Sequence, residues 1–177
     1  LPLLPHESCP PEGALGFRFQ KYGIVKWQHL YTPRQLVVLS KFVQVLRSEA
    51  FTKAIAEGCP DEKTRTATLT CLALALGRVN DLSATLCRWL PTRDIVAAAN
   101  GGLNKMPMVL DFAETNPIGG AGGDFCGQVD WIARVIAHVL ESNLPVGSVQ
   151  QSPGKCSPLP ADLAQALITD PPSHDAF

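Results

Sequence analysis

The fold is set by the stretch TPRQLVVLSKFVQVLRSEA, residues 32–50. Thr32 is a good N-cap residue, and Pro33 suits the first turn of a helix. Apolar side chains then recur at spacings of three and four, which places them on one face of a helix. Gly58 and Pro60 are expected to end that helix. The apolar stripe consists of Leu36, Leu39, Val43, Leu46 and Ala50.

A second long helix is predicted to follow the first after a short Gly-Pro turn. Asp61 and Glu62 carry negative charge at its start, which favours a helix N-terminus. The pattern predicts that it runs to about Arg88 or Trp89, before Pro91. Two amphipathic helices joined by a short turn form an antiparallel hairpin. The stripe, which indicates core rather than a site, consists of Leu69, Leu72, Leu76, Val79, Leu82 and Leu86.

The fold class expected from the remaining chain is mainly α, with a few short strands. Residues 1–31 read as an extended lead-in in which 15–20 and 24–27 pair as a β-hairpin, and residues 32–143 as a helical domain. Asp94–Ala99 is expected to form a short helix, and residues 142–165 hold one expected strand at 146–150. A later helix carries the apolar face Val129, Ile132, Val135, Ile136, Val139 and Leu140.

Composition limits the class of protein more than it identifies a function. The 177 residues are 46% hydrophobic and 18% charged, which fits one domain with a real core. The low fraction of charged residues fits either a large hydrophobic core or an apolar surface covered by a partner. A net charge of -1 gives no overall attraction to DNA, although a local basic face is still compatible with binding. The longest apolar run, Leu72–Leu76, is far too short for a membrane span, and we expect no signal peptide.

The cysteines indicate a reducing, cytoplasmic setting. None of the six forms a C-x-x-C pair, so thiols packed as small apolar groups are favoured over disulfides or zinc, and no metal site is expected. The chain has no initiating Met, which suggests a piece of a longer polypeptide. The six residues are Cys9, Cys59, Cys71, Cys87, Cys126 and Cys156.

The candidate chemistry lies in the last ten residues. Ala166–Ile168 reads as a buried strand, and Asp170-Pro171-Pro172 follows at its carboxyl end, where open α/β sheets place catalytic groups. A carboxylate and a backbone carbonyl from such a turn can accept hydrogen bonds from an adenine amino group and compensate its developing positive charge. The same three residues also occur as an ordinary strand-ending turn.

The residues after this turn bear on base stacking. A flipped base is usually held by an aromatic side chain at the next position. That position is Ser173 here, which cannot stack, whereas His174 and Phe177 offer rings nearby. We therefore assign these three residues as weak substrate-binding candidates.

Two further patterns have plainer explanations. Residues 108–111 followed by glycines could suggest a cofactor loop, but the first glycine, Gly119, comes too late, and a loop is favoured. Asp111 and Glu114 could share a helix face as paired carboxylates for acid–base chemistry. An acid capping a local turn is the favoured alternative.

The order of several blocks resembles the large adenine-specific DNA methylases that contain a zinc ribbon. The resemblance covers nearly the whole chain. The blocks, in chain order, are residues 11–23, Lys26–Leu36, Leu72–Leu76, Leu86–Trp89, Met106–Pro117 and Ile168–Pro172.

This resemblance implies a function and a place within a larger enzyme. It makes Asp170, Pro171 and Pro172 the catalytic turn, with S-adenosylmethionine as cofactor and DNA as partner. In the family the cofactor loop and zinc ribbon lie upstream. Residues 144–177 would then begin the catalytic α/β portion, with the terminal strand at the edge of a Rossmann-like sheet. The chain would need the rest of its polypeptide and be inactive alone; the alternative is a helical DNA- or protein-binding module without methyl transfer.

Overall fold

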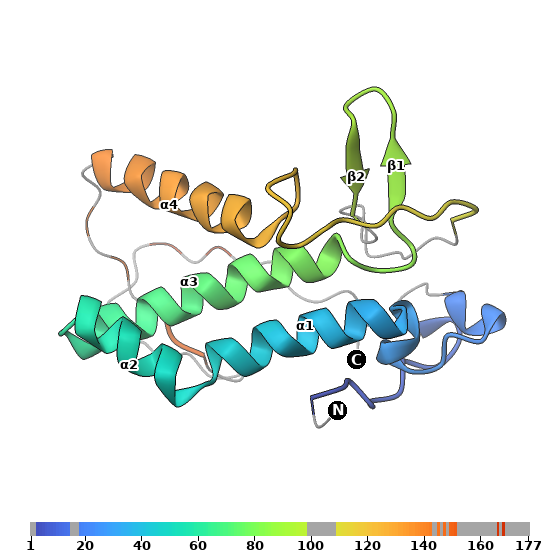
Figure 1. Ribbon diagram of the computed structural model, residues 1–177, viewed down its shortest axis with the longest axis horizontal. Helices are drawn as coiled ribbons and strands as arrows, with labels where there is room; N and C mark the ends of the chain where they lie inside the picture. Colours follow the sequence, from blue (N-terminus) through green and yellow to red (C-terminus); the bar gives the residue numbers. More distant parts are fainter. Residues whose placement is uncertain are drawn as a thin grey trace.

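The computed structural model describes residues 3–14, 18–98, 109–142, 145, 147, 149–151, 166 and 168. Four α-helices dominate this part of the chain (Figure 1). They are α1 (Pro33–Leu46), α2 (Glu49–Gly58), α3 (Glu62–Asp81) and α4 (Phe125–Glu141). Two 3-10 turns, η2 (Phe19–Tyr22) and η3 (Trp27–Leu30), precede them, and two short strands, β1 (Arg88–Leu90) and β2 (Ile95–Ala97), lie between α3 and α4. The mainly helical class predicted from the sequence is confirmed.

The first predicted helix starts as expected but is interrupted. Thr32 and Gln35 form a reciprocal capping box at the start of α1, in which each side chain bonds the other residue's backbone N–H. The prediction of one helix reaching Gly58 is wrong, because the chain breaks after Leu46. At the break the Ser48 hydroxyl accepts the N–H of Phe51 and begins α2 as a new helix.

The second predicted helix ends earlier than the pattern indicates. Asp61 caps α3 by accepting the N–H of Thr64 at 2.8 Å, as expected. The helix stops at Asp81, and the buried residues that follow turn away from its axis. There the Thr85 N–H donates to the Leu30 carbonyl at 2.7 Å, so a tertiary bond replaces a helical one.

A β-hairpin occupies the region that was predicted as helix. β1 and β2 pair antiparallel, with Trp89 opposite Val96. Asp94, in the connection, has a φ of 50°. The prediction of a short helix beginning at Asp94 is therefore wrong for residues 95–97. The hairpin projects away from the helices in Figure 1.

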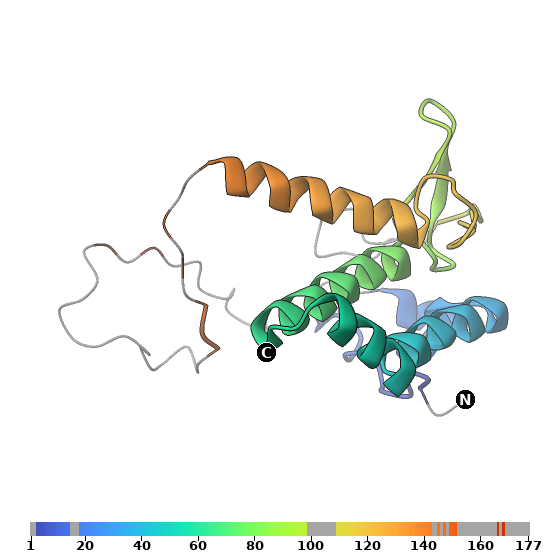
Figure 2. The same ribbon diagram turned by 60° about the vertical axis from the view of Figure 1, so that its left-hand side comes forward.

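The helices pack as the predicted antiparallel pair with additions. α1 and α3 run side by side in opposite directions, and α2 joins them at one end (Figure 1). α4 packs on α3, which lies between α1 and α4 in both Figure 1 and Figure 2. The rings of Phe42 and Phe125, 5.0 Å apart, link α1 to the start of α4. This packing brings the start of α1, the end of α3 and the segment before α4 close together.

The lead-in packs against the base of the hairpin without forming the predicted sheet. Residues 19–22 form η2 rather than a strand, and the pairing found is a single bridge between Ser8 and Lys26. Phe19 is fully buried, with its ring 6.4 Å from that of Trp27. Residues 15–17 lie outside the described part. The nearby core cluster consists of Leu30, Ala84, Leu86 and Cys87.

The predicted catalytic α/β portion is not confirmed. Ala166 and Ile168 have no strand pairing, as is also true of residues 147, 149 and 150, and Leu167 lies outside the described residues. Within the described ranges β1 and β2 form the sheet, and its antiparallel pairing is unlike a Rossmann-like arrangement. Over the same ranges, no helix combines the length and apolar character needed to cross a membrane.

Candidate functional site

The predicted catalytic and substrate-binding residues lie outside the described part of the chain. The structure therefore does not test whether these residues lie together, and the expected catalytic turn stays a prediction. These residues are Asp170, Pro171, Pro172, Ser173, His174 and Phe177.

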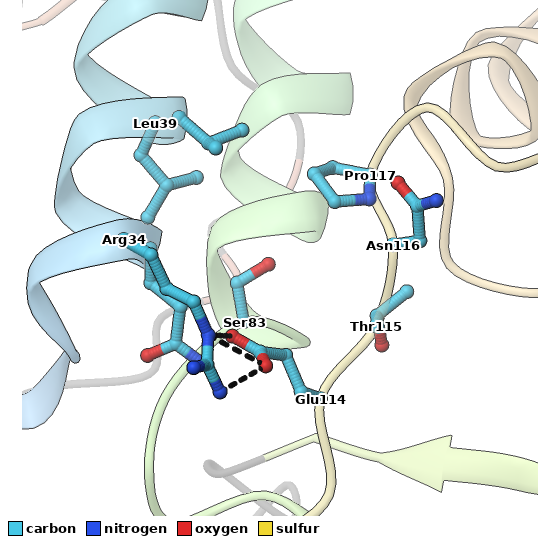
Figure 3. Close-up of a pocket in the computed structure, with 9 residues that line it drawn as sticks. Arg34, Leu39, Ser83, Glu114, Thr115, Asn116 and Pro117 are labelled. Carbon is cyan, nitrogen blue, oxygen red and sulfur yellow. Dashed lines mark hydrogen bonds and ion pairs between the residues drawn. The ribbon is translucent and has the colours of Figure 1, made fainter.

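A pocket of about 300 Å³ lies where α1, the end of α3 and residues 114–117 meet (Figure 3). Its walls are mixed, with apolar side chains from α1 and Pro117 and polar groups from all three segments. This mixture of apolar walls and a few polar groups is typical of small-molecule sites. The lining residues are Arg34, Gln35, Val38, Leu39, Ser83, Glu114, Thr115, Asn116 and Pro117.

One side of the pocket is formed by an ion pair between residues 80 positions apart. The Arg34 Nε donates to both carboxylate oxygens of Glu114 at 2.9 Å, and Nη2 donates to Oε2 at 2.6 Å (Figure 3). The hydrogen bonds to Glu114, and then its charge, raise the pKa of Arg34 further. Because the side chains are 67% and 28% exposed, the pair orients groups more than it stabilises the fold.

Gln35 is one of the most buried polar residues of the pocket. The residue is 5% exposed, and its Oε1 accepts the Thr32 N–H at 2.8 Å in the capping box. That bond identifies the oxygen of the amide and therefore fixes where Nε2 lies. Nε2 is buried and has no acceptor among the described residues. Buried donors are normally paired, so this amide is a candidate ligand contact.

The segment that carries Glu114 is held by hydrogen bonds at both ends. Asp111 accepts the backbone N–H groups of Trp89 and Phe112, both at 2.8 Å. Thr115, which is buried, donates its hydroxyl to the Leu82 carbonyl at 3.2 Å. The segment is not helical, so the less favoured interpretation, in which Asp111 and Glu114 share a helix face, is wrong. The favoured alternative fits Asp111 through its bond to the adjacent Phe112 N–H, while its bond to the Trp89 N–H is a tertiary contact.

The glycine-rich stretch beyond this segment builds a helix start rather than an anion site. Gly123 has a φ of 99°, and a Cβ there would lie 2.9 Å from the Thr115 methyl group. Asp124, 7% exposed, caps α4 by accepting the Gly127 N–H at 2.9 Å. A carboxylate already at this helix terminus opposes a second anion. The preference for a loop over a cofactor motif agrees with this geometry.

Metal and thiol chemistry find no support in the described ranges. No group of three or more His, Cys, Asp or Glu side chains there is placed to hold a metal ion. Cys87 is fully buried, and its Sγ lies 3.4 Å from the Asp81 carbonyl oxygen. Burial raises the pKa of Cys9, which disfavours a reactive thiolate there.

The sequence did not single out Arg34, Gln35 or Asn116 as site residues. Arg34 and Gln35 belong to a helix start that capping alone explains, and Glu114 was considered only as a partner of Asp111. Their position in blocks that carry the family resemblance was the available signal. Comparisons with protein-family models, characterised proteins and solved structures found no match to this chain.

Proposed function

We propose that this chain is a segment of a DNA adenine amino-methyltransferase that uses S-adenosylmethionine. The described helices would form a module beside the catalytic turn at Asp170-Pro171-Pro172. The observation that carries the proposal is the meeting of separate sequence blocks at one place. Arg34 from the block Lys26–Leu36 bonds Glu114 from the block Met106–Pro117.

A second contact joins another pair of these blocks. The Trp89 N–H, at the end of the block Leu86–Trp89, bonds Asp111. Helix propensity depends on residues within a few positions of each other. Propensity alone would therefore not predict contacts between blocks that are far apart in the sequence. Contacts between blocks far apart in sequence instead fit a shared site. This supports the resemblance without testing methyl transfer.

The described residues do not supply a cofactor site. The glycines at 119–123 follow an irregular segment rather than a strand, and Asp124 occupies the helix start beyond them. S-adenosylmethionine would therefore be held by other parts of the polypeptide, as the family resemblance implies. In this chain the proposed role of Asp170 and the Pro171 carbonyl is to accept the two amino hydrogens of the target adenine.

The test is methyl transfer to DNA by the natural polypeptide that carries this chain. With tritiated S-adenosylmethionine we expect transfer to adenine, its loss in Asp170→Ala, and retention in the neighbouring control Asp175→Ala. Circular dichroism checks that both variants fold. Undiminished transfer in Asp170→Ala, or no transfer by the parent, would refute the proposal. The 177-residue chain alone should give no calorimetric signal with the cofactor.

A binding module without methyl transfer is the second candidate, and the surface of α4 favours it. Trp131 is 64% and Leu140 75% exposed, and Val135, Ile136 and Val139 are also exposed on this helix. Contiguous exposed apolar surface marks interaction sites. Binding of a protein partner through this face would persist at high salt, whereas DNA binding weakens steeply. A salt series of gel-shift and pull-down assays separates the two.

A further inference from the structure

We propose that the pocket beside Arg34 and Glu114 binds an unstacked nucleobase through an edge that carries an amino group next to a ring nitrogen, as in adenine. The inference rests on the proposed function, because it assigns to that enzyme a second place that recognises its substrate. It is built from other residues than the proposed catalytic turn at Asp170. Three features of the pocket carry it.

The first feature is a buried donor with a fixed direction. The Gln35 oxygen is held by the Thr32 N–H, so turning the amide over would place its NH₂ group against another donor. Nε2 therefore stays a donor, and it lacks an acceptor among the described residues. A ring nitrogen of a base is an acceptor of the required kind.

The second feature is the electrostatic balance of the site. Arg34 and Glu114 neutralise each other through three short hydrogen bonds, so the pocket has little net attraction for an anion. A carboxylate can accept about four hydrogen bonds, which leaves Glu114 able to accept one from an amino group. A donor and an acceptor lining one pocket match a neutral edge with an amino group beside a ring nitrogen. A phosphate would instead face the Glu114 charge.

The third feature is shape. Leu39 and Pro117 lie on opposite sides of the pocket in Figure 3 and offer apolar surfaces for the faces of a flat ring. A volume of about 300 Å³ accommodates a base with part of its sugar but not a base pair within a duplex. The base must therefore be single-stranded or flipped out of its stack.

The experiment follows the side-chain NH₂ signal of Gln35 by ¹⁵N–¹H NMR in the 177-residue chain while adenosine is added. Purine riboside, which lacks the amino group, and inorganic phosphate are added in parallel. We expect adenosine to shift the Gln35 signal and purine riboside to bind about 10-fold more weakly, because Glu114 loses its donor. Phosphate should leave the signal in place.

Two variants sharpen this test. Gln35→Glu keeps an oxygen for the Thr32 N–H but replaces the donor by an acceptor, so adenosine affinity should fall by about 10-fold or more. Gln44→Glu makes the same change on α1 away from the pocket and should bind like the parent. Affinities of the variants are followed through backbone signals of residues 114–116. If Gln35→Glu does not fold, the comparison of adenosine with purine riboside decides whether the pocket assignment holds.

The outcomes separate this site from the proposed function. A Gln35 signal that ignores adenosine, responds equally to purine riboside, or responds only to phosphate overturns the pocket assignment. Unaltered adenosine affinity in a folded Gln35→Glu variant does so as well. Adenosine binding here together with no methyl transfer by the parent polypeptide leaves the pocket standing and refutes the methyltransferase. Methyl transfer that depends on Asp170, together with no adenosine response at Gln35, supports the methyltransferase and overturns the pocket assignment.

Discussion

Replacing Asp124 by Ala should destabilise the protein, because this carboxylate begins α4 from a buried position. Its Oδ1 accepts the Gly127 N–H at 2.9 Å, and the residue is 7% exposed, so water cannot readily replace the lost acceptor. Loss of an N-cap typically costs 0.5–2 kcal/mol, and burial places this one near the upper end, at about 2 kcal/mol. For a chain of this size that corresponds to a fall of roughly 4–8 °C in Tm.

The control is Asp124→Asn, which keeps an oxygen acceptor in the same place. Asn and Asp are similar as N-caps, so this variant should remain within about 1 kcal/mol of the parent despite losing the charge. The assay is urea unfolding followed by circular dichroism, with hydrogen exchange at Gly127 reporting the local effect. An Ala variant within about 0.5 kcal/mol of the parent would refute the reasoning. An Asn variant as unstable as the Ala variant would show that the acceptor is not what matters.

Three further outcomes follow from the same packing. Gly123→Ala should cost more than about 1 kcal/mol in urea unfolding, because φ is 99° and the new Cβ would meet the Thr115 methyl group at 2.9 Å; a neutral effect would contradict the geometry. Burial raises the pKa of Tyr31, so the folded state keeps its proton above pH ~10 while the unfolded state loses it. Stability should therefore fall as pH rises through that region, and a Tyr31→Phe variant with an identical pH profile would disprove the link. Val135→Lys should change stability by no more than about 0.5 kcal/mol, because the side chain is 50% exposed; a larger loss in thermal unfolding would show that this face of α4 is packed.

Local signals predicted the starts of helices but not their ends. Thr32 and Asp61 cap helices through groups no more than three residues away, so the sequence suffices to find them. The end of α3 depends on a tertiary bond between Thr85 and Leu30, which no pattern within residues 61–89 contains. The apolar residues that continue the stripe beyond Asp81, such as Leu86, are buried in the core cluster instead.

The site was less accessible to sequence reasoning than the fold, for a related reason. Arg34 and Glu114 each have an ordinary local explanation, as an exposed helix residue and as an acid in a loop. What makes them a site is the packing of α1 against α3 and the anchoring of residues 111–115, and both are non-local. The blocks of the family resemblance include Arg34 and Glu114, but the resemblance gave no reason to pair them.

The identity of residue 35 separates a capping role from a binding role. A capping box works with either Glu or Gln at this position, since both offer an oxygen to the N-cap N–H. Glu would also place a negative charge at the start of α1, which favours the helix. In this pocket, however, a second carboxylate near Glu114 would compete for Arg34 and leave a buried charge poorly compensated. Gln keeps the cap, keeps the Arg34–Glu114 pair balanced, and leaves a buried donor that has no partner among the described residues. The capping box accounts for the oxygen of this side chain, and the proposed base accounts for its nitrogen.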